Sequence, residues 1–140
     1  MMSVPRTVLF VCTHNSGRSQ MAEAFLNHRY PGRFRAFSAG TQPTSLSPAV
    51  VEVMAEMGID ISGRRAKDVS EFLGRKFDYV ITLCDQAQEA CPFFPGGTVR
   101  LHQGFDDPSH CQGQREEALA CVRRIRDAIQ AWLANEFARE

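Results

Sequence analysis

A short polar segment near the start of the chain carries the residues best suited to chemistry. It reads Cys12-Thr13-His14-Asn15-Ser16-Gly17-Arg18-Ser19 and follows the apolar run of residues 8–11. Because five residues separate the cysteine from the arginine, the loop between them can close with its backbone amides pointing inward, at the positive end of a following helix. Such a loop binds a tetrahedral oxyanion, and the planar guanidinium of Arg18 can hold two of its oxygens at once. The alternative is a buried cysteine followed by an ordinary polar turn.

Cys12 is the candidate nucleophile. The inward-pointing amides and hydroxyls such as that of Ser19 would stabilise a thiolate. In such surroundings the pKa of a free cysteine, about 8.5, commonly falls to roughly 3.5–7.5. We therefore expect Cys12 to ionise more readily than an ordinary cysteine.

A second candidate is an aspartate in front of a proline, in the segment Gly104-Phe105-Asp106-Asp107-Pro108. The rigid proline can aim Asp107 at a leaving group as a general acid. The alternative is a simple turn, because Asp-Pro is a common turn sequence.

Two further cysteines are candidates for redox chemistry. Cys84 ends an expected strand, and Cys91 follows a polar stretch, residues 85–89, which we expect to be a loop. Two thiols beside a nucleophilic thiolate can pass on successive disulfides, although Cys84 can also be a buried structural cysteine. An odd number of cysteines at irregular spacing predicts no structural disulfide framework. We interpret Cys121, at the edge of a helical stripe, and the loop residue Cys111 as bystanders, although redox use of Cys111 stays open.

Strands and helices alternate along the chain, which predicts an α/β fold. The expected strands are residues 8–11, 34–39, 79–83 and 98–101, and the expected helices are residues 19–28, 48–57, 67–73 and 116–137. This order requires crossover connections and a parallel sheet with helices on both faces. Ligands of such folds bind at the carboxyl ends of the strands, so the segments after residues 11, 83 and 101 should meet on one rim. The irregular residues 93–97 and 103–114 are expected to be loops over the site.

Length and charge limit the remaining possibilities. A chain of 140 residues with 44% hydrophobic content fits a single domain, residues 1–140. Sixteen basic residues balance sixteen acidic ones, so neither nucleic acid nor a membrane is an expected partner. The run of residues 8–11 is too short for a signal peptide and no stretch is long enough to span a bilayer. We therefore expect a cytoplasmic protein, with a monomer as the default.

Taken together, these motifs resemble the thioredoxin-coupled arsenate reductases, which are relatives of the low-molecular-weight protein tyrosine phosphatases. The resemblance covers residues 8 to about 107. Its carriers are Cys12 to Glu23, Ser38-Ala39-Gly40, Ile59-Asp60-Ile61-Ser62, Thr82-Leu83-Cys84, Cys91-Pro92 and Gly104 to Pro108. The family implies a three-layer sandwich with a four-stranded parallel sheet of order 2-1-3-4.

The resemblance also implies a role for each candidate residue. Cys12 would be the nucleophile, Arg18 the oxyanion clamp and Asp107 the general acid, while Cys84 and Cys91 would form the thiol relay. Thr13, His14, Asn15, Ser16, Gly17 and Ser19 would complete the oxyanion-binding loop. The implied reaction reduces arsenate, and phosphate and sulfate would bind as analogues of this substrate. Thioredoxin would reduce the final disulfide. Glutaredoxin or a small thiol stays open as an alternative electron donor. Gly17 departs from the many relatives that carry a second cysteine beside the arginine.

No cofactor is required by this reading, but some family members bind potassium near the loop. Asn15, Glu23 and Ser38 match that site. Asp68 matches it only if one residue nearby is deleted.

Two rival functions remain at this point. In a phosphotyrosine phosphatase, water would hydrolyse a phosphoenzyme formed on Cys12. Against this, Ser109 and His110 stand where phosphatases carry tyrosines, and Gln20 stands where they usually carry proline. The other rival is a non-enzymatic anion sensor. The presence of Asp107 as a candidate proton donor argues against it, because binding alone needs no proton donor.

Overall fold

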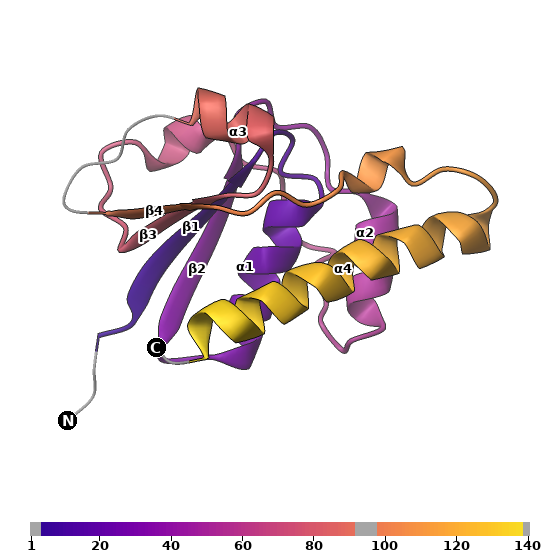
Figure 1. Ribbon diagram of the computed structural model, residues 1–140, viewed down its shortest axis with the longest axis horizontal. Coiled ribbons are helices and arrows are strands. Elements are labelled where there is room, and N and C mark those ends of the chain that lie inside the picture. The colour runs from indigo at the N-terminus through magenta and orange to yellow at the C-terminus, as the bar shows by residue number, and fades with distance from the viewer. Residues whose placement is uncertain (1–3, 92–97, 139–140) are drawn as a thin grey trace.

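The computed structural model describes residues 4–91 and 98–138 and has a four-stranded parallel sheet at its centre (Figure 1). The order along the sheet is β2-β1-β3-β4, which confirms the predicted topology. The strands are β1 (Arg6–Cys12), β2 (Phe34–Gly40), β3 (Tyr79–Thr82) and β4 (Val99–His102). The helices are α1 (Arg18–Arg29), α2 (Pro48–Ala55), α3 (Asp85–Ala90) and α4 (Arg115–Phe137), with short 3₁₀ helices η1 (Val69–Phe72) and η2 (Pro108–His110).

The central strand explains why the apolar run of residues 8–11 has no polar alternation. All four of these residues are fully buried, as expected for a parallel strand covered on both faces. Side chains three apart on a strand point to opposite faces, and β2 shows what covers each face. Phe34 packs on Phe137 of α4, whereas Phe37 packs on Phe72 of η1. Figure 1 shows α1 and α4 side by side, with α2 next to α4.

The register of the strands fixes the rim on which the site is built. Val11 of β1 is paired with Thr82 of β3, and Cys12 with Gly40 of β2. The loops that follow these strands therefore leave the sheet at the same edge, as predicted. Residues 93–97, expected to be part of a loop over this edge, lie outside the described residues.

Two local predictions were wrong. Residues 85–89, expected to be a loop, lie in helix α3, which buries only Ala87 and was too short and polar to give a periodic signal. The helix expected at residues 67–73 is reduced to the 3₁₀ turn η1, because Asp68 forms a capping box with Glu71 and starts the turn two residues later. Over the described ranges, no helix is both long and apolar enough to cross a bilayer.

Candidate active site

The loop between β1 and α1 is held from outside by the chain that follows β2. Backbone amides of that segment donate to four loop carbonyls, in the pairs Thr41–Cys12, Gln42–Thr13, Thr44–His14 and Ser47–Ser16, at 2.7–3.1 Å. The approach is so close at Gly40 that a Cβ there would lie 2.6 Å from the carbonyl oxygen of Thr13. Since its carbonyls are bound on this side, the loop has a fixed backbone with Cys12 at one end and Arg18 at the other.

Asn15 braces the loop from within. It is fully buried and adopts φ of 50°, a left-handed conformation that asparagine tolerates better than most residues. Its side-chain amide donates to Ser19 Oγ at 2.6 Å, and its Oδ1 accepts from the Gln20 amide and from the backbone N–H of Lys67. Every polar atom of the Asn15 side chain is thus used to hold the turn.

The thiol of Cys12 lies beneath the loop, with only 2% of the residue exposed. Its sulfur is 2.8 Å from Ser19 Oγ and accepts from the backbone N–H of Asn15 at 3.3 Å. Burial raises the pKa of this thiol above its ordinary value, although the hydrogen bonds of Ser19 and Asn15 and the charge of Arg18 act in the opposite direction. The expected lowering of the Cys12 pKa was therefore wrong, because the effect of complete burial outweighs that of the hydrogen-bond donors and of Arg18.

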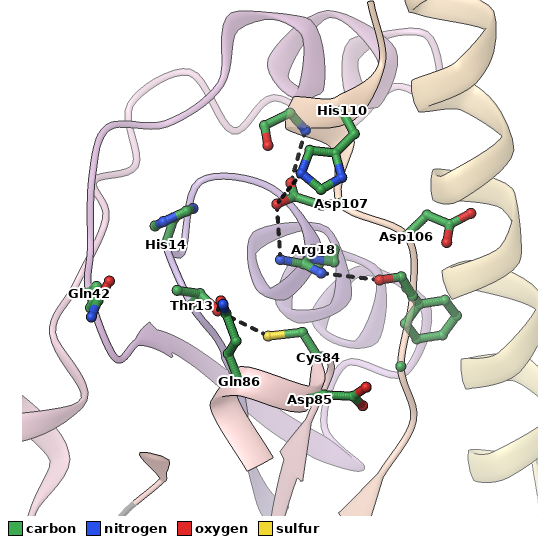
Figure 2. A pocket seen from close by; sticks show the side chains of 13 residues that line it. Thr13, His14, Arg18, Gln42, Cys84, Asp85, Gln86, Asp106, Asp107 and His110 are labelled. Carbon is green, nitrogen blue, oxygen red and sulfur yellow. Dashed lines mark hydrogen bonds and ion pairs between the residues drawn. The ribbon is translucent and has the colours of Figure 1, made fainter. Parts of the chain in front are cut away.

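Above the loop lies an open pocket of about 730 Å³, drawn in Figure 2. Its lining includes Thr13, His14, Arg18, Cys84 and Asp107, so five predicted site residues meet here. Arg18 is only 7% exposed; its Nη1 donates to the carbonyl of Phe105 at 3.1 Å, and its Nη2 lies 3.6 Å from Asp107 Oδ2. A cationic fork and a carboxylate thus face the same space.

Asp107 both caps a turn and faces the pocket. Its Oδ1 accepts from the backbone N–H of Ser109 at 2.9 Å and begins η2, as an Asp-Pro turn requires. Burial would raise the pKa of this carboxyl, but the hydrogen bonds of Ser109 and the charges of Arg18 and His110 lower it below the ordinary value. Asp107 is therefore an ionised carboxylate that pairs with Arg18.

The two relay candidates lie at different depths. Cys84 is 8% exposed, and its sulfur lies 3.2 Å from Thr13 Oγ1, so it reaches the pocket from the junction between β3 and α3. Cys91 is half-buried at the far end of α3 and does not line the pocket. Burial raises the pKa of the Cys91 thiol, although Arg100 acts in the opposite direction.

A small polar network beside Cys84 was not predicted. Asp85 and Gln86 line the pocket, and Gln86 lies 3.2 Å from Thr13 Oγ1. His102 bridges Thr82 Oγ1 at 2.8 Å and Asp85 Oδ1 at 3.1 Å. The available signal was sequence position: Asp85 follows β3 by three residues and His102 ends β4, so both fall at the predicted rim.

The residues matched to a potassium site do not fit that ion. Glu23 accepts a hydrogen bond from Ser38 Oγ at 2.8 Å, but its carboxylate is already paired with Arg64 and lies 3.8 Å from the ammonium of Lys67. The carboxylate of Asp68 instead caps η1 by accepting from the backbone N–H of Ser70. No group of three or more His, Cys, Asp or Glu side chains placed to hold a metal ion occurs in the part of the chain that the structure describes.

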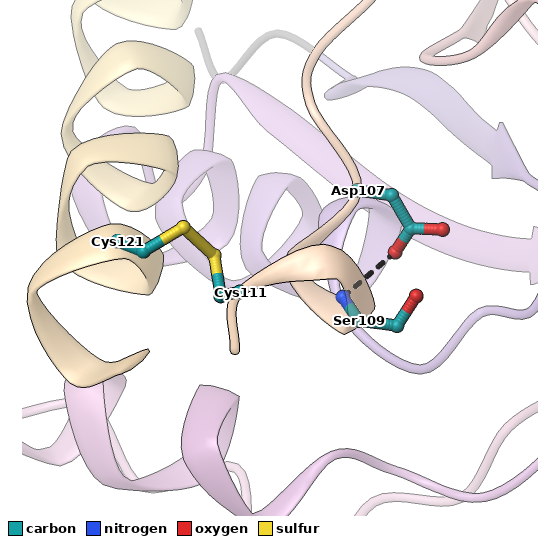
Figure 3. Close-up of a disulfide and its surroundings, with 4 residues drawn as sticks. All are labelled: Asp107, Ser109, Cys111 and Cys121. Carbon is teal, nitrogen blue, oxygen red and sulfur yellow. Dashed lines mark hydrogen bonds between the residues drawn. A yellow bond between two sulfur atoms is a disulfide. The ribbon is translucent and has the colours of Figure 1, made fainter. Parts of the chain in front are cut away.

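Cys111 and Cys121 are not bystanders: they form a disulfide (Figure 3). Their Cα atoms are 5.6 Å apart although ten positions separate them in the sequence. The turn between η2 and α4 brings them together, with Gly113 at a φ of 114° that favours glycine. The bond ties the segment that carries Asp107 to α4, and spacing alone gave no sign of it.

Known proteins resemble this chain over nearly its whole length. Residues 7–140 match the low molecular weight phosphotyrosine protein phosphatase family. The arsenate reductase of Shouchella clausii is 40% identical over 126 residues, which are 90% of this chain and 91% of that protein. A solved arsenate reductase in its oxidized state is 29% identical and covers 96% of this chain and 98% of its own, with a TM-score of 0.80. The thioredoxin-dependent arsenate reductase of Corynebacterium glutamicum is 33% identical and covers 94% of this chain and 65% of its own, with a TM-score of 0.65.

Proposed function

This chain belongs to the low molecular weight phosphotyrosine protein phosphatase family, and from that premise we propose that it is an arsenate reductase. Relatives that are 40% identical over about nine-tenths of the chain or more are arsenate reductases. The rival reading, a phosphotyrosine phosphatase, shares the first chemical step, because arsenate and phosphate have nearly the same shape and charge. The choice between them depends on what happens to the covalent intermediate.

The observation that carries the proposal is a second thiol at the oxyanion pocket. Cys84 lines the pocket together with Arg18 and Asp107, next to the loop that begins at Cys12. Hydrolysis of a phosphoenzyme needs water at this place, whereas reduction needs a thiol that can supply two electrons as a disulfide forms. A thiol on the rim therefore favours reduction over hydrolysis.

In the proposed first step, arsenate binds in the loop. The guanidinium of Arg18 turns away from Asp107 and holds two oxygens of the arsenate. The dianion takes the proton of the Cys12 thiol, which burial would otherwise retain, and the resulting thiolate attacks arsenic. Bound arsenate also places negative charge beside Asp107 and withdraws its cationic partner, so the pKa of Asp107 rises and the carboxyl can carry a proton. Asp107 gives this proton to the departing oxygen, which leaves as water.

The later steps move electrons between sulfur and arsenic. The Cys84 thiolate attacks the sulfur of Cys12, and the sulfur–arsenic bond breaks with its electron pair on arsenic. Arsenic thereby passes from the +5 to the +3 state and leaves as arsenite, while a Cys12–Cys84 disulfide remains. Cys91 then attacks Cys84, which frees the Cys12 thiolate and forms a Cys84–Cys91 disulfide.

An external dithiol completes the cycle, and we propose thioredoxin for this role. Support comes from the Corynebacterium glutamicum relative, which is thioredoxin-dependent. The absence of a required cofactor, a cytoplasmic location and a monomeric, single-domain state are parts of the same proposal and stay predictions.

The test is a pair of steady-state assays on the wild type, Cys84→Ser and Asp107→Asn: thioredoxin-linked arsenate reduction and hydrolysis of a small aryl phosphate. The wild type should reduce arsenate and hydrolyse the ester slowly. Cys84→Ser should lose reduction and keep hydrolysis, whereas Asp107→Asn should lower both by roughly 10²–10⁴-fold, because each first step expels an oxygen that needs a proton. Efficient hydrolysis without arsenate turnover, whether thioredoxin, glutaredoxin or a small thiol is supplied, would establish the phosphatase instead.

A further inference from the structure

A buried carboxylate, that of Glu23, lies on helix α1 outside the lining of the pocket. Glu23 is only 7% exposed, and a charge removed from water in this way requires partners of opposite sign. Arg64 supplies one positive charge and Lys67 a second, while Ser38 donates a hydrogen bond. Side chains of the protein itself therefore supply positive charge to the buried carboxylate of Glu23.

The ammonium group of Lys67 is surrounded by oxygen atoms. Nζ lies 3.4 Å from Ser38 Oγ, 3.4 Å from the carbonyl oxygen of Arg65 and 3.8 Å from Glu23 Oε1. A hydroxyl, a peptide carbonyl and a carboxylate are also the kinds of oxygen that bind a monovalent metal ion in place of its water shell. The lysine thus places a single positive charge where such an ion would lie.

The backbone of the same residue reaches the nucleophile through a chain of hydrogen bonds. The N–H of Lys67 donates to Asn15 Oδ1 at 2.9 Å, Asn15 donates to Ser19 Oγ at 2.6 Å, and Ser19 lies 2.8 Å from the sulfur of Cys12. The carbonyl of Lys67 accepts a hydrogen bond from the backbone N–H of Gly40, the residue that packs closely against the loop. Anchoring the Lys67 side chain at Glu23 therefore also anchors the backbone that orients Asn15.

We propose that Lys67 is a built-in cation: its ammonium group takes the place of a monovalent metal ion between Glu23, Ser38 and the Arg65 carbonyl, and makes the loop independent of potassium. Lys67 is on this view a positioning residue, which acts on Cys12 through Asn15 and Ser19. This explains why the residues matched to a potassium site do not fit that ion: the ammonium group of Lys67 already supplies the positive charge there.

The chain is well suited to a direct test, since it has only two lysines, Lys67 and the exposed Lys76. Melting temperatures of the wild type, Lys67→Gln, Lys67→Met and the control Lys76→Gln are compared in potassium, sodium and choline chloride at equal ionic strength. The wild type and Lys76→Gln should melt at the same temperature in all three salts. In choline chloride, both Lys67 variants should melt ~3–5 °C below the wild type. Lys67→Gln, which adds an amide oxygen and leaves room for an ion, should regain part of that loss in potassium alone.

A second readout rests on the proposed function. The kcat/KM for arsenate should be the same in the three salts for the wild type, and should rise with potassium only for Lys67→Gln. A merely structural lysine would give no rescue by an ion. If arsenate turnover is absent altogether, the melting series still decides the matter. A wild type stabilised selectively by potassium, or Lys67 variants that behave like Lys76→Gln in every salt, would overturn the proposal.

Discussion

Cys84 and Cys91 lie at the two ends of the same short helix, as the N-cap and the C-cap of α3. At a rise of ~1.5 Å per residue, the seven steps between them place their Cα atoms roughly 10 Å apart. A disulfide requires Cα atoms closer than about 7 Å. The proposed relay therefore cannot finish while α3 is intact, and the helix must open when Cys91 attacks Cys84.

Oxidation should consequently unfold α3. Six residues make a helix of marginal stability, and only Ala87 anchors it in the core, so opening is feasible. Amide hydrogen exchange across residues 85–90 should be faster by at least tenfold in the Cys84–Cys91 oxidised form than in the reduced form, while α1 stays protected. Cys91→Ser, treated with the same oxidant, is the control and should keep the slow exchange; an oxidised wild type with a protected α3 would contradict the geometry.

Cys91→Ser should stop after one turnover. Without the last thiol, the cycle should release about one arsenite per enzyme and halt as a Cys12–Cys84 disulfide. Peptide mapping by mass spectrometry identifies the trapped bond. A bond from Cys12 to any cysteine other than Cys84 would show that the order of thiols is wrong.

Arg18→Lys should lose most of the activity although the charge is kept. A lysine ammonium cannot hold two oxygens with one planar group, nor reach the Phe105 carbonyl and Asp107 together as Arg18 does. We expect kcat/KM for arsenate to fall at least 100-fold, a larger loss than for the control Arg124→Lys on the exposed face of α4. Near-normal turnover of Arg18→Lys would rule out the clamp role.

The Cys111–Cys121 disulfide should be visible by thiol counting and by stability. The unfolded, non-reduced protein should react with Ellman's reagent at three thiols, those of Cys12, Cys84 and Cys91. Reduction, or the double change Cys111→Ser with Cys121→Ser, should lower the free energy of unfolding by about 2–3 kcal/mol, the usual effect of a loop of this length. Five reactive thiols before reduction would disprove the bond.

Glu56 should make stability sensitive to acid. Hydrogen bonds from Arg123 and Arg126 lower the pKa of this carboxyl from 4.5 to about 2. Its stabilising effect is therefore complete above pH 4.5 and is lost as the pH falls from there towards 2. Glu56→Gln should melt below the wild type at pH 7, and the difference in melting temperature should shrink as the pH falls from about 4.5 towards 2. The control Glu136→Gln, at the exposed end of α4, should melt at the same temperature as the wild type both at pH 7 and at acid pH.

The sequence by itself determined the fold and the composition of the site. Local patterns carried this information: an uninterrupted apolar run for β1, a proline after Ser47 for α2, an apolar stripe for α4, and the Cys12-to-Arg18 spacing for the loop. The sheet order came from family resemblance, and the parallel register then placed Arg18, Cys84 and Asp107 at one pocket. These features depend on residues close together in the chain or on motifs that a family shares.

Only the tertiary structure decided the features that depend on which distant side chains meet. The high pKa of Cys12 results from complete burial, which is a property of the whole core and not of the loop. The bond between Cys111 and Cys121 depends on how a turn folds back onto α4. The placement of Cys84 and Cys91 at opposite ends of a helix depends on α3, which no periodic pattern in the sequence predicted. The ammonium of Lys67 reaches Glu23 across 44 positions of sequence, a contact that no local pattern encodes because it exists only once both segments are packed against β2.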